Sequence, residues 1–156
     1  MAARLCFVKG DATAPAERPA IIAHICNDIG GWGKGFVLAI SSKWPAPEQA
    51  YRAWHVSGDG FALGAMQLVD VEPGLSVANI IGQRGIRSSN GIPPVRYEAI
   101  EAGLTKVAAV ARKSGASVHM PRIGCGLAGG SWEAVEPLVR TCLIERGVSA
   151  TVYDFP

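Results

Sequence analysis

Short apolar runs that suit buried strands alternate along this chain with segments of helical periodicity. The runs are bounded by Gly, Pro or Asp, which favours strands covered on both faces of a sheet. Strands are predicted at residues 4–9, 20–26, 61–71, 75–82, 116–120 and 148–153, and helices at residues 34–44, 47–56, 93–115 and 131–147. This alternation predicts an α/β fold, namely a three-layer α/β/α sandwich.

The central sheet is predicted to be mixed. The sequence "EPG" at residues 72–74 separates two strand-like runs, and its Pro and Gly suit a turn that pairs these runs antiparallel. In the last helix Pro137 lacks an amide donor, so regular structure is expected only from about Glu136. With 156 residues, 49% of them hydrophobic, the chain supports one core, and we expect a single domain over residues 1–156.

Two glycine-dense stretches follow predicted strands. They are "NDIGGWGKG" at residues 27–35 and "RIGCGLAGG" at residues 122–130. Glycine lets backbone amides approach a ligand closely, and loops of this kind cradle phosphate groups with N–H donors. In open α/β sheets ligands bind beyond the carboxyl ends of the strands, where both loops begin. The sequence therefore predicts a phosphate-containing ligand between the two loops.

Two common nucleotide-binding motifs fit these loops poorly. A P-loop would need Gly where Asp28 stands and Ser or Thr where Gly35 stands, so this motif is excluded. Residues 124–129 match G-x-G-x-x-G, and Asp154 ends the next strand as a ribose-binding acid would. Because the sequence ends two residues later, we expect no room for the rest of a mononucleotide-binding half. An NAD-binding oxidoreductase is kept as a distant alternative.

Charge and composition argue against several classes of protein. A net charge of +2 without a basic block argues against indiscriminate nucleic-acid binding. The amino terminus lacks the apolar segment of a signal peptide, and no window reaches the roughly 18 apolar residues of a membrane span. We expect a cytoplasmic monomer that has no membrane contact and uses no cofactor. No metal site or disulfide is expected from the spacing of the cysteines and histidines, which are Cys6, Cys26, Cys125, Cys142, His24, His55 and His119.

Five short motifs occur in a fixed order. They are "KGDAT" (9–13), "AHICN" (23–27), "GGWGKG" (30–35), "MPRIGCGL" (120–127) and "TVY" (151–153). The ordered set resembles the signatures of the macrodomain family, whose members read or erase ADP-ribose. "MPRIGCGL" is similar to the branch that contains the terminal ADP-ribose protein glycohydrolase, which removes ADP-ribose esterified to glutamate or aspartate. The resemblance covers nearly the whole chain and implies a bacterial-type stand-alone member whose partners are ADP-ribose and mono-ADP-ribosylated proteins.

The resemblance also implies individual ligand contacts. Asp11 and the Ala12 amide would meet the adenine, Asn27 the distal ribose, and Tyr153 the adenine ring. The alternatives are a turn cap for Asp11, a cap of its own loop for Asn27, and edge-strand packing for Tyr153. Trp32 would contact the ligand or fill the core. The other implied contacts lie in the two loops, at Gly31, Gly33, Gly35, Pro121, Ile123, Gly124, Cys125, Gly126, Leu127 and Ala128.

Two catalytic residues of that branch are missing from this chain. The Asp after the second loop's Leu is replaced by Ala128, and the Lys would fall at Gly82 or Gln83. ADP-ribose esters release a carboxylate whose conjugate acid has a pKa of about 4, so departure needs little general acid catalysis. We therefore expect a water-mediated ADP-ribosyl-ester hydrolase that relies on positioning and oriented amides, with Asn27, Gln83 and Arg84 as its catalytic residues.

Other functions remain open at the level of sequence. Many macrodomains hold ADP-ribose without hydrolysing anything, so a non-catalytic reader is an alternative. A hydrolase of O-acetyl-ADP-ribose or of ADP-ribosylated DNA is another, although the near-neutral charge weighs against DNA. Arg84, Arg87 and Arg96 form a loose basic cluster that either meets the modified protein or is a solvated loop.

Overall fold

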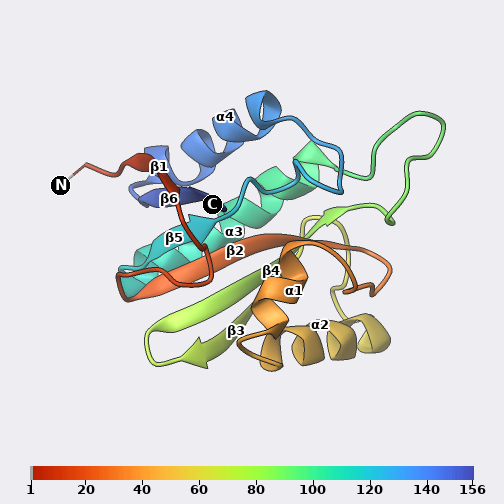
Figure 1. Cartoon of the computed structure of the whole chain (residues 1–156), viewed down its shortest axis with the longest axis horizontal. Helices are drawn as coiled ribbons and strands as arrows, with labels where there is room; N and C mark the ends of the chain where they lie inside the picture. The colour runs from red at the N-terminus through yellow and green to blue at the C-terminus, as the bar shows by residue number, and fades with distance from the viewer. Residues whose placement is uncertain (1) are drawn as a thin grey trace.

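The computed structural model describes residues 2–156 and contains one six-stranded sheet in the order β1-β6-β5-β2-β4-β3 (Figure 1). The strands are β1 (Leu5–Lys9), β2 (Ala20–Asn27), β3 (Met66–Glu72), β4 (Leu75–Gln83), β5 (Ser117–Met120) and β6 (Ala150–Asp154). The helices are α1 (Phe36–Ser41), α2 (Ala46–Ser57), α3 (Tyr97–Ser114), α4 (Trp132–Cys142) and the short 3₁₀ helix η1 (Ile144–Arg146). β3 pairs antiparallel with β4, and the other pairs are parallel, which confirms the predicted mixed sheet.

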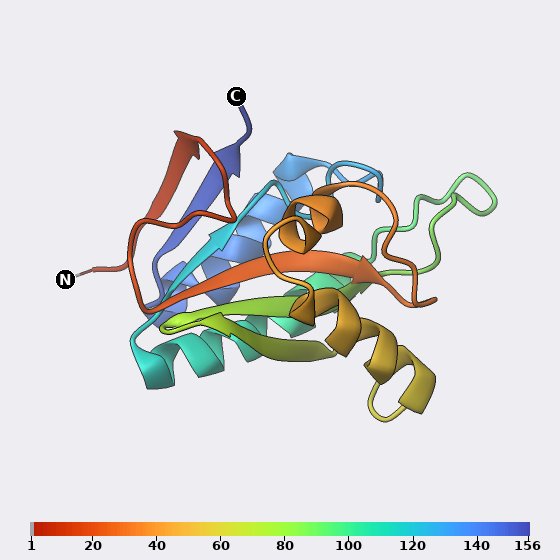
Figure 2. The same cartoon turned by 60° about the horizontal axis from the view of Figure 1, so that its bottom comes forward.

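Helices cover both faces of the sheet, as Figures 1 and 2 show. α3 and α4 form one core with alternate residues of β2 such as Ile21 and Ala23. α1 and α2 form the other core with the intervening residues Ile22 and Cys26. β2 is therefore buried on both sides, which accounts for its continuous apolar sequence. The three-layer α/β/α prediction is confirmed.

Some element boundaries differ from those predicted. α4 begins at Trp132 and not near Glu136, because the Ser131 hydroxyl caps the helix by accepting a hydrogen bond from the Ala134 amide (3.3 Å). Pro137 lies inside α4 on its exposed side, where packing of the opposite buried face compensates for one lost backbone bond. The segment expected to start β3 forms turns up to Ala65 instead.

The carboxyl ends of β2, β4 and β5 meet at one edge of the sheet, because these strands are parallel. The two glycine-rich loops leave β2 and β5 at this edge, and the long segment between β4 and α3 leaves it beside them (Figure 2). Within residues 2–156, none of the helices is both long and apolar enough to cross a bilayer.

Candidate functional site

The first glycine loop is shaped by the side chain of Asn27 at the end of β2. Its Oδ1 accepts hydrogen bonds from the amides of Ile29 (3.0 Å) and Gly31 (2.9 Å), and its Nδ2 donates to the Gly31 carbonyl (2.9 Å). The hydroxyl of the buried Tyr51 also donates to Oδ1 (2.8 Å) and to the Asn27 carbonyl (2.6 Å). The carboxamide thus caps its own loop, which was the alternative to a direct ribose contact.

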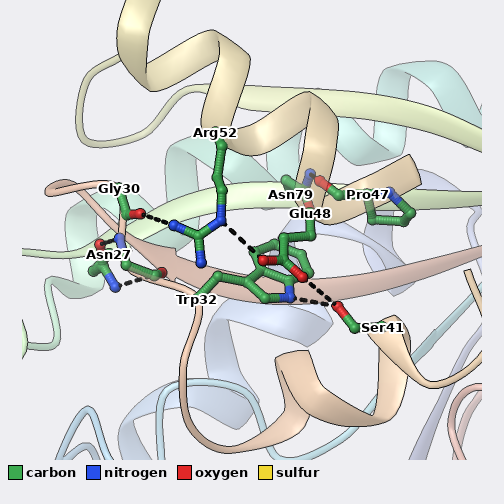
Figure 3. A network of polar contacts seen from close by, with 9 residues as sticks. Asn27, Gly30, Trp32, Ser41, Pro47, Glu48, Arg52 and Asn79 are labelled. Atoms are coloured by element: carbon green, nitrogen blue, oxygen red, sulfur yellow. Dashed lines mark hydrogen bonds and ion pairs between the residues drawn. The ribbon is translucent and has the colours of Figure 1, made fainter. Parts of the chain in front are cut away.

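Trp32 fastens the same loop to α1 and α2 (Figure 3). Its ring is only 4% exposed, and its Nε1 donates to the Ser41 hydroxyl (2.7 Å). Ser41 donates to Glu48 (3.0 Å), and Arg52 pairs with Glu48 (2.9 Å) while donating to a carbonyl of the loop at Gly30 (3.2 Å). Trp32 therefore fills the core, and its indole is not part of the ligand pocket described below.

The second glycine loop is closed on itself and braced by the segment that follows β4. The Gly124 carbonyl accepts a hydrogen bond from the Gly130 amide (2.7 Å), and Val95 donates its amide to the Ala128 carbonyl (3.0 Å). Gly124 has a φ of 74°, and a β-carbon there would lie 2.9 Å from Ile100. Glycine is thus required at this position for both backbone conformation and space.

The segment after β4 also holds the first loop. Asp28 donates its amide to the Gln83 carbonyl (3.1 Å), and its carboxylate accepts the Gly85 amide (2.7 Å). The Gln83 side chain donates to the Gly85 carbonyl (3.0 Å). Both glycine loops are therefore hydrogen-bonded to one segment, which fixes their relative positions.

A pocket of about 270 Å³ lies between the two loops. The loops approach each other across it, since a β-carbon on Gly35 would lie 3.4 Å from the side chain of the exposed Leu127. Eight of the predicted site residues line the pocket, namely Gly35, Gln83, Pro121, Ile123, Gly124, Gly126, Leu127 and Ala128. Lining residues that were not predicted are His24, Ile25, Lys34, Phe36, Val37 and Arg122.

Backbone amides of both loops lack hydrogen-bond partners within the part of the chain that the structure describes. They include the amides of Gly33, Lys34, Gly35, Gly126, Leu127 and Ala128. The pocket lining includes no carboxylate and two cations, Lys34 and Arg122, the second of which is paired with Asp154 outside the lining. Free N–H groups together with positive charge favour an anionic ligand that presents oxygen acceptors.

The residues predicted at the adenine lie at the same sheet edge, outside the pocket. The Asp11 carboxylate accepts the amide (2.8 Å) and hydroxyl (2.7 Å) of Thr13 and lies 4.0 Å from Lys43. Burial raises the pKa of Asp11, but the Thr13 hydrogen bonds and Lys43 outweigh it, so the pKa is lowered overall. Ala12 is buried. The hydroxyl of Tyr153 bonds His119 Nδ1 (2.8 Å). Asp11 thus forms the turn cap considered as its alternative, with its second oxygen facing Lys43.

The remaining predicted residues are placed as follows. Gln83 lines the pocket, whereas Arg84 is exposed and lies outside the lining. Gly31 is held beneath the first loop by Asn27. Burial raises the pKa of Cys125, an effect that Arg122 only partly offsets, so its thiol is not an activated nucleophile.

Asp154 does not serve as the ribose-binding acid of a dinucleotide site. Its two carboxylate oxygens accept hydrogen bonds from Arg122, at 2.7 Å from Nε and 3.0 Å from Nη2. This bidentate pair holds Arg122 against the rings of Phe7 and Trp132, whose centroids lie 5.4 and 5.1 Å from its guanidinium carbon. The carboxylate that the oxidoreductase alternative needs is therefore engaged within the protein.

His24 and Arg122 are the lining residues that sequence reasoning missed most clearly. His24 lies within an apolar strand, three residues before Asn27, and was interpreted as a core or surface histidine rather than as a ligand contact. Its place in the strand that leads into the first glycine loop was the available signal. Arg122 lies inside the "MPRIGCGL" motif, next to residues that were selected.

The free energy of unfolding should fall on acidification because of His24. Burial lowers its folded-state pKa from 6.5 to about 4, against the opposing effect of the Asn79 hydrogen bond. The unfolded chain takes up the proton first, so stability present above pH 6.5 is lost toward pH 4 by up to about 1.4 kcal/mol per pH unit. Urea unfolding at several pH values tests this, and His24→Gln should show a shallower slope than the parent. His119, whose pKa burial also lowers, leaves a residual slope in both.

Other hollows of the protein are less suited to an anion. A groove of about 520 Å³ lies at the opposite sheet edge, where Asp70 and Glu72 are the charged lining residues. A third, of about 480 Å³, has a polar lining in which Glu17 lies with Arg112 and Arg146. No group of three or more His, Cys, Asp or Glu in residues 2–156 is arranged to hold a metal ion.

Known proteins of similar sequence and structure point to one family. No protein-family model matches the chain. Chromodomain-helicase-DNA-binding protein 1-like of Mus musculus is 32% identical over 160 residues, covering 96% of this chain, but the chain spans only 18% of that protein. ADP-ribose 1''-phosphate phosphatase of Candida albicans is 24% identical over 137 residues, covering 83% of this chain and 88% of that protein.

A solved structure settles the family. The macrodomain protein from Streptomyces coelicolor is 55% identical, with a TM-score of 0.87, and the match covers 97% of this chain and 99% of that one. The chain belongs to the macrodomain family.

Proposed function

We propose that the protein binds ADP-ribose between its two glycine loops and hydrolyses ADP-ribosyl esters of glutamate or aspartate side chains on proteins. The observation that carries this proposal is the set of unpartnered loop amides, five of which belong to residues that line a pocket without carboxylates. A diphosphate presents acceptors alone, so it matches these donors. The relative named ADP-ribose 1''-phosphate phosphatase supports both an ADP-ribose ligand and hydrolysis in general.

The size of the pocket indicates which part of the ligand it holds. Pockets that enclose a drug-sized ligand measure about 300–1,000 Å³, and this one measures about 270 Å³. The diphosphate and one ribose would fill it. The adenine would then lie outside, toward Asp11 and Tyr153 at the same sheet edge.

Hydrolysis in this pocket would depend on a positioned water molecule. Gln83 donates a hydrogen bond from Nε2 to the Gly85 carbonyl. The side-chain oxygen Oε1 of Gln83 is therefore left to accept a hydrogen bond from the attacking water. Water would attack the anomeric carbon of the distal ribose, the carboxylate would leave with the bonding electrons, and the water's proton would pass to solvent. Asn27 would contribute by holding the first loop in the conformation that binds the ligand. The exposed Arg84 would contact the protein to which the ADP-ribose is attached.

Release of ADP-ribose from a glutamate-modified protein, followed by mass spectrometry, tests the proposal. Gln83→Ala and Asn27→Ala are each expected to slow release about tenfold to a hundredfold, since one positions water and the other the loop. Arg140→Ala alters an exposed ion pair on α4 and serves as the control with parental activity. Release by both site variants at the parental rate would refute the assignment.

A non-catalytic reader is the second candidate. It is favoured by the pocket lining, which contains no carboxylate to serve as a general base. The same assay distinguishes the two functions, because a reader holds the ester-modified peptide without releasing ADP-ribose.

A further inference from the structure

The side chain of His24 has one ring nitrogen without a hydrogen-bond partner. Among the buried side-chain nitrogen and oxygen atoms of residues 2–156, His24 Nδ1 alone lacks a partner. The residue is 1% exposed and lines the pocket between the glycine loops. Buried polar atoms are nearly always satisfied, so an unpaired one beside a pocket suggests a ligand contact.

Hydrogen bonds on the Nε2 side of the ring determine which of the two ring nitrogens carries the proton. Gln67 donates its Nε2 to the Ala50 carbonyl (3.0 Å), so its Oε1 is the acceptor for Asn79 Nδ2 (3.0 Å). Asn79 Nδ2 also donates to the Pro47 carbonyl (3.2 Å), so Asn79 Oδ1 faces His24 Nε2 at 2.5 Å (Figure 3 shows Asn79 and Pro47). Nε2 must therefore carry the proton.

This orientation leaves Nδ1 as a bare lone pair. Burial lowers the pKa of His24 to about 4, so the ring is neutral near pH 7 and Nδ1 can only accept a hydrogen bond. The neighbouring Cys26 thiol lies 3.9 Å from Nε2, and burial raises its pKa, so it supplies no charge to the ring. The two ring nitrogens point away from each other, which directs Nδ1 away from β4.

We infer that His24 Nδ1 accepts a hydrogen bond from a hydroxyl of the distal ribose and thereby makes the pocket selective for a sugar over a second phosphate. This inference rests on the proposed binding of ADP-ribose. The diphosphate has no hydrogen to donate at neutral pH, whereas the ribose hydroxyls have. The half-buried Phe36 ring packs 6.0 Å from His24 and lines the same pocket, so a small movement of Phe36 or one bridging water brings the hydroxyl into reach.

Two substitutions separate the two ring nitrogens. In His24→Gln the side-chain amide replaces Nε2 and can still donate to Asn79, but no acceptor remains at the Nδ1 position. In His24→Asn the carbonyl oxygen replaces Nδ1, and the Asn79 contact is lost. If His24 has a purely structural role, His24→Gln should be more stable than His24→Asn and bind ADP-ribose at least as well. If Nδ1 contacts the ligand, His24→Asn should retain more ADP-ribose affinity than His24→Gln. Cys26→Ala, on the same face of β2 and in the same core, removes packing beside the ring but leaves both ring nitrogens in place.

Calorimetric titration with ADP-ribose and with ADP, which lacks the distal ribose, tests the inference. His24→Gln should raise the Kd for ADP-ribose about fivefold to tenfold, the value of one hydrogen bond, and leave the Kd for ADP at the parental value. Cys26→Ala should leave the ratio of the two constants unchanged. An unchanged ratio in His24→Gln overturns the inference while ADP-ribose binding by the parent stands. Failure of the parent to bind ADP-ribose overturns both.

Nitrogen NMR of the histidine-labelled parent gives a test that needs no variant to fold. The His24 Nδ1 resonance should appear as an unprotonated nitrogen and move upfield when ADP-ribose is added, with Nε2 protonated throughout. ADP should leave it in place. A resonance that ignores saturating ADP-ribose, or a proton found on Nδ1 in the free protein, contradicts the inference.

Discussion

Replacing Gly126 with valine is expected to abolish ADP-ribose binding and to leave the fold intact. A β-carbon at this position meets no atom within 4 Å, and Gly126 is exposed, so the free protein tolerates a side chain. A phosphate oxygen bonded to an unpartnered loop amide lies about 2.9 Å from that nitrogen, which leaves no room for a branched side chain. We expect the Kd to rise at least about a hundredfold, or about 2.8 kcal/mol.

Calorimetry with ADP-ribose and a thermal unfolding scan check this prediction together. Gly126→Ala should give an intermediate loss of affinity, because its methyl group is smaller. The midpoint of unfolding should be nearly the same for both variants and the parent. If Gly126→Val binds ADP-ribose as the parent does, the second loop does not hold the diphosphate through its amides.

Trp32→Ala is expected to produce the largest loss of stability, about 3–5 kcal/mol. The indole is 4% exposed, lies 5.3 Å from His24 and 5.4 Å from Tyr51, and donates to Ser41, so its removal leaves a cavity and an unpaired hydroxyl network. The first glycine loop loses its connection to α1 as well. Chemical denaturation measures the first effect and ADP-ribose titration the second.

Trp32→Phe is the matched variant. It retains an aromatic ring in the core but loses the hydrogen bond to Ser41, which should cost about 1 kcal/mol of stability. ADP-ribose affinity should stay near the parental value, because the ring does not line the pocket. A large loss of affinity at nearly unchanged stability would instead mean that the indole contacts the ligand.

The sequence predicted the sheet and the place of the site because those depend on local patterns. The apolar run of β2 and the glycines that follow it are visible within one short stretch, and parallel strands bring their carboxyl ends to one edge. The antiparallel pairing of β3 with β4 followed from the turn at residues 72–74. The predicted start of α4 near Glu136 was wrong, because packing of the buried face of the helix compensates for the hydrogen bond lost at Pro137.

The roles of individual side chains were harder to predict because they are decided by distant partners. Asn27 caps its loop with help from Tyr51, which lies 24 positions away in the sequence. The bare nitrogen of His24 depends on Asn79, 55 positions away, whose orientation is set in turn by Gln67. A single sequence does not show which distant residues form hydrogen bonds with each other. Two interpretations therefore stayed open for both Trp32 and Asn27 until the structure was known.

The segment between β4 and α3 supports both walls of the cleft. Gly85 is bonded to Asp28 on one side, and Val95 is bonded to Ala128 on the other. Neither wall can move outward alone without breaking a hydrogen bond to this shared segment, so the two glycine loops are coupled through it. The same segment exposes Ile86 and Arg87 to solvent, so a substitution there that disturbs the segment is expected to loosen both loops together.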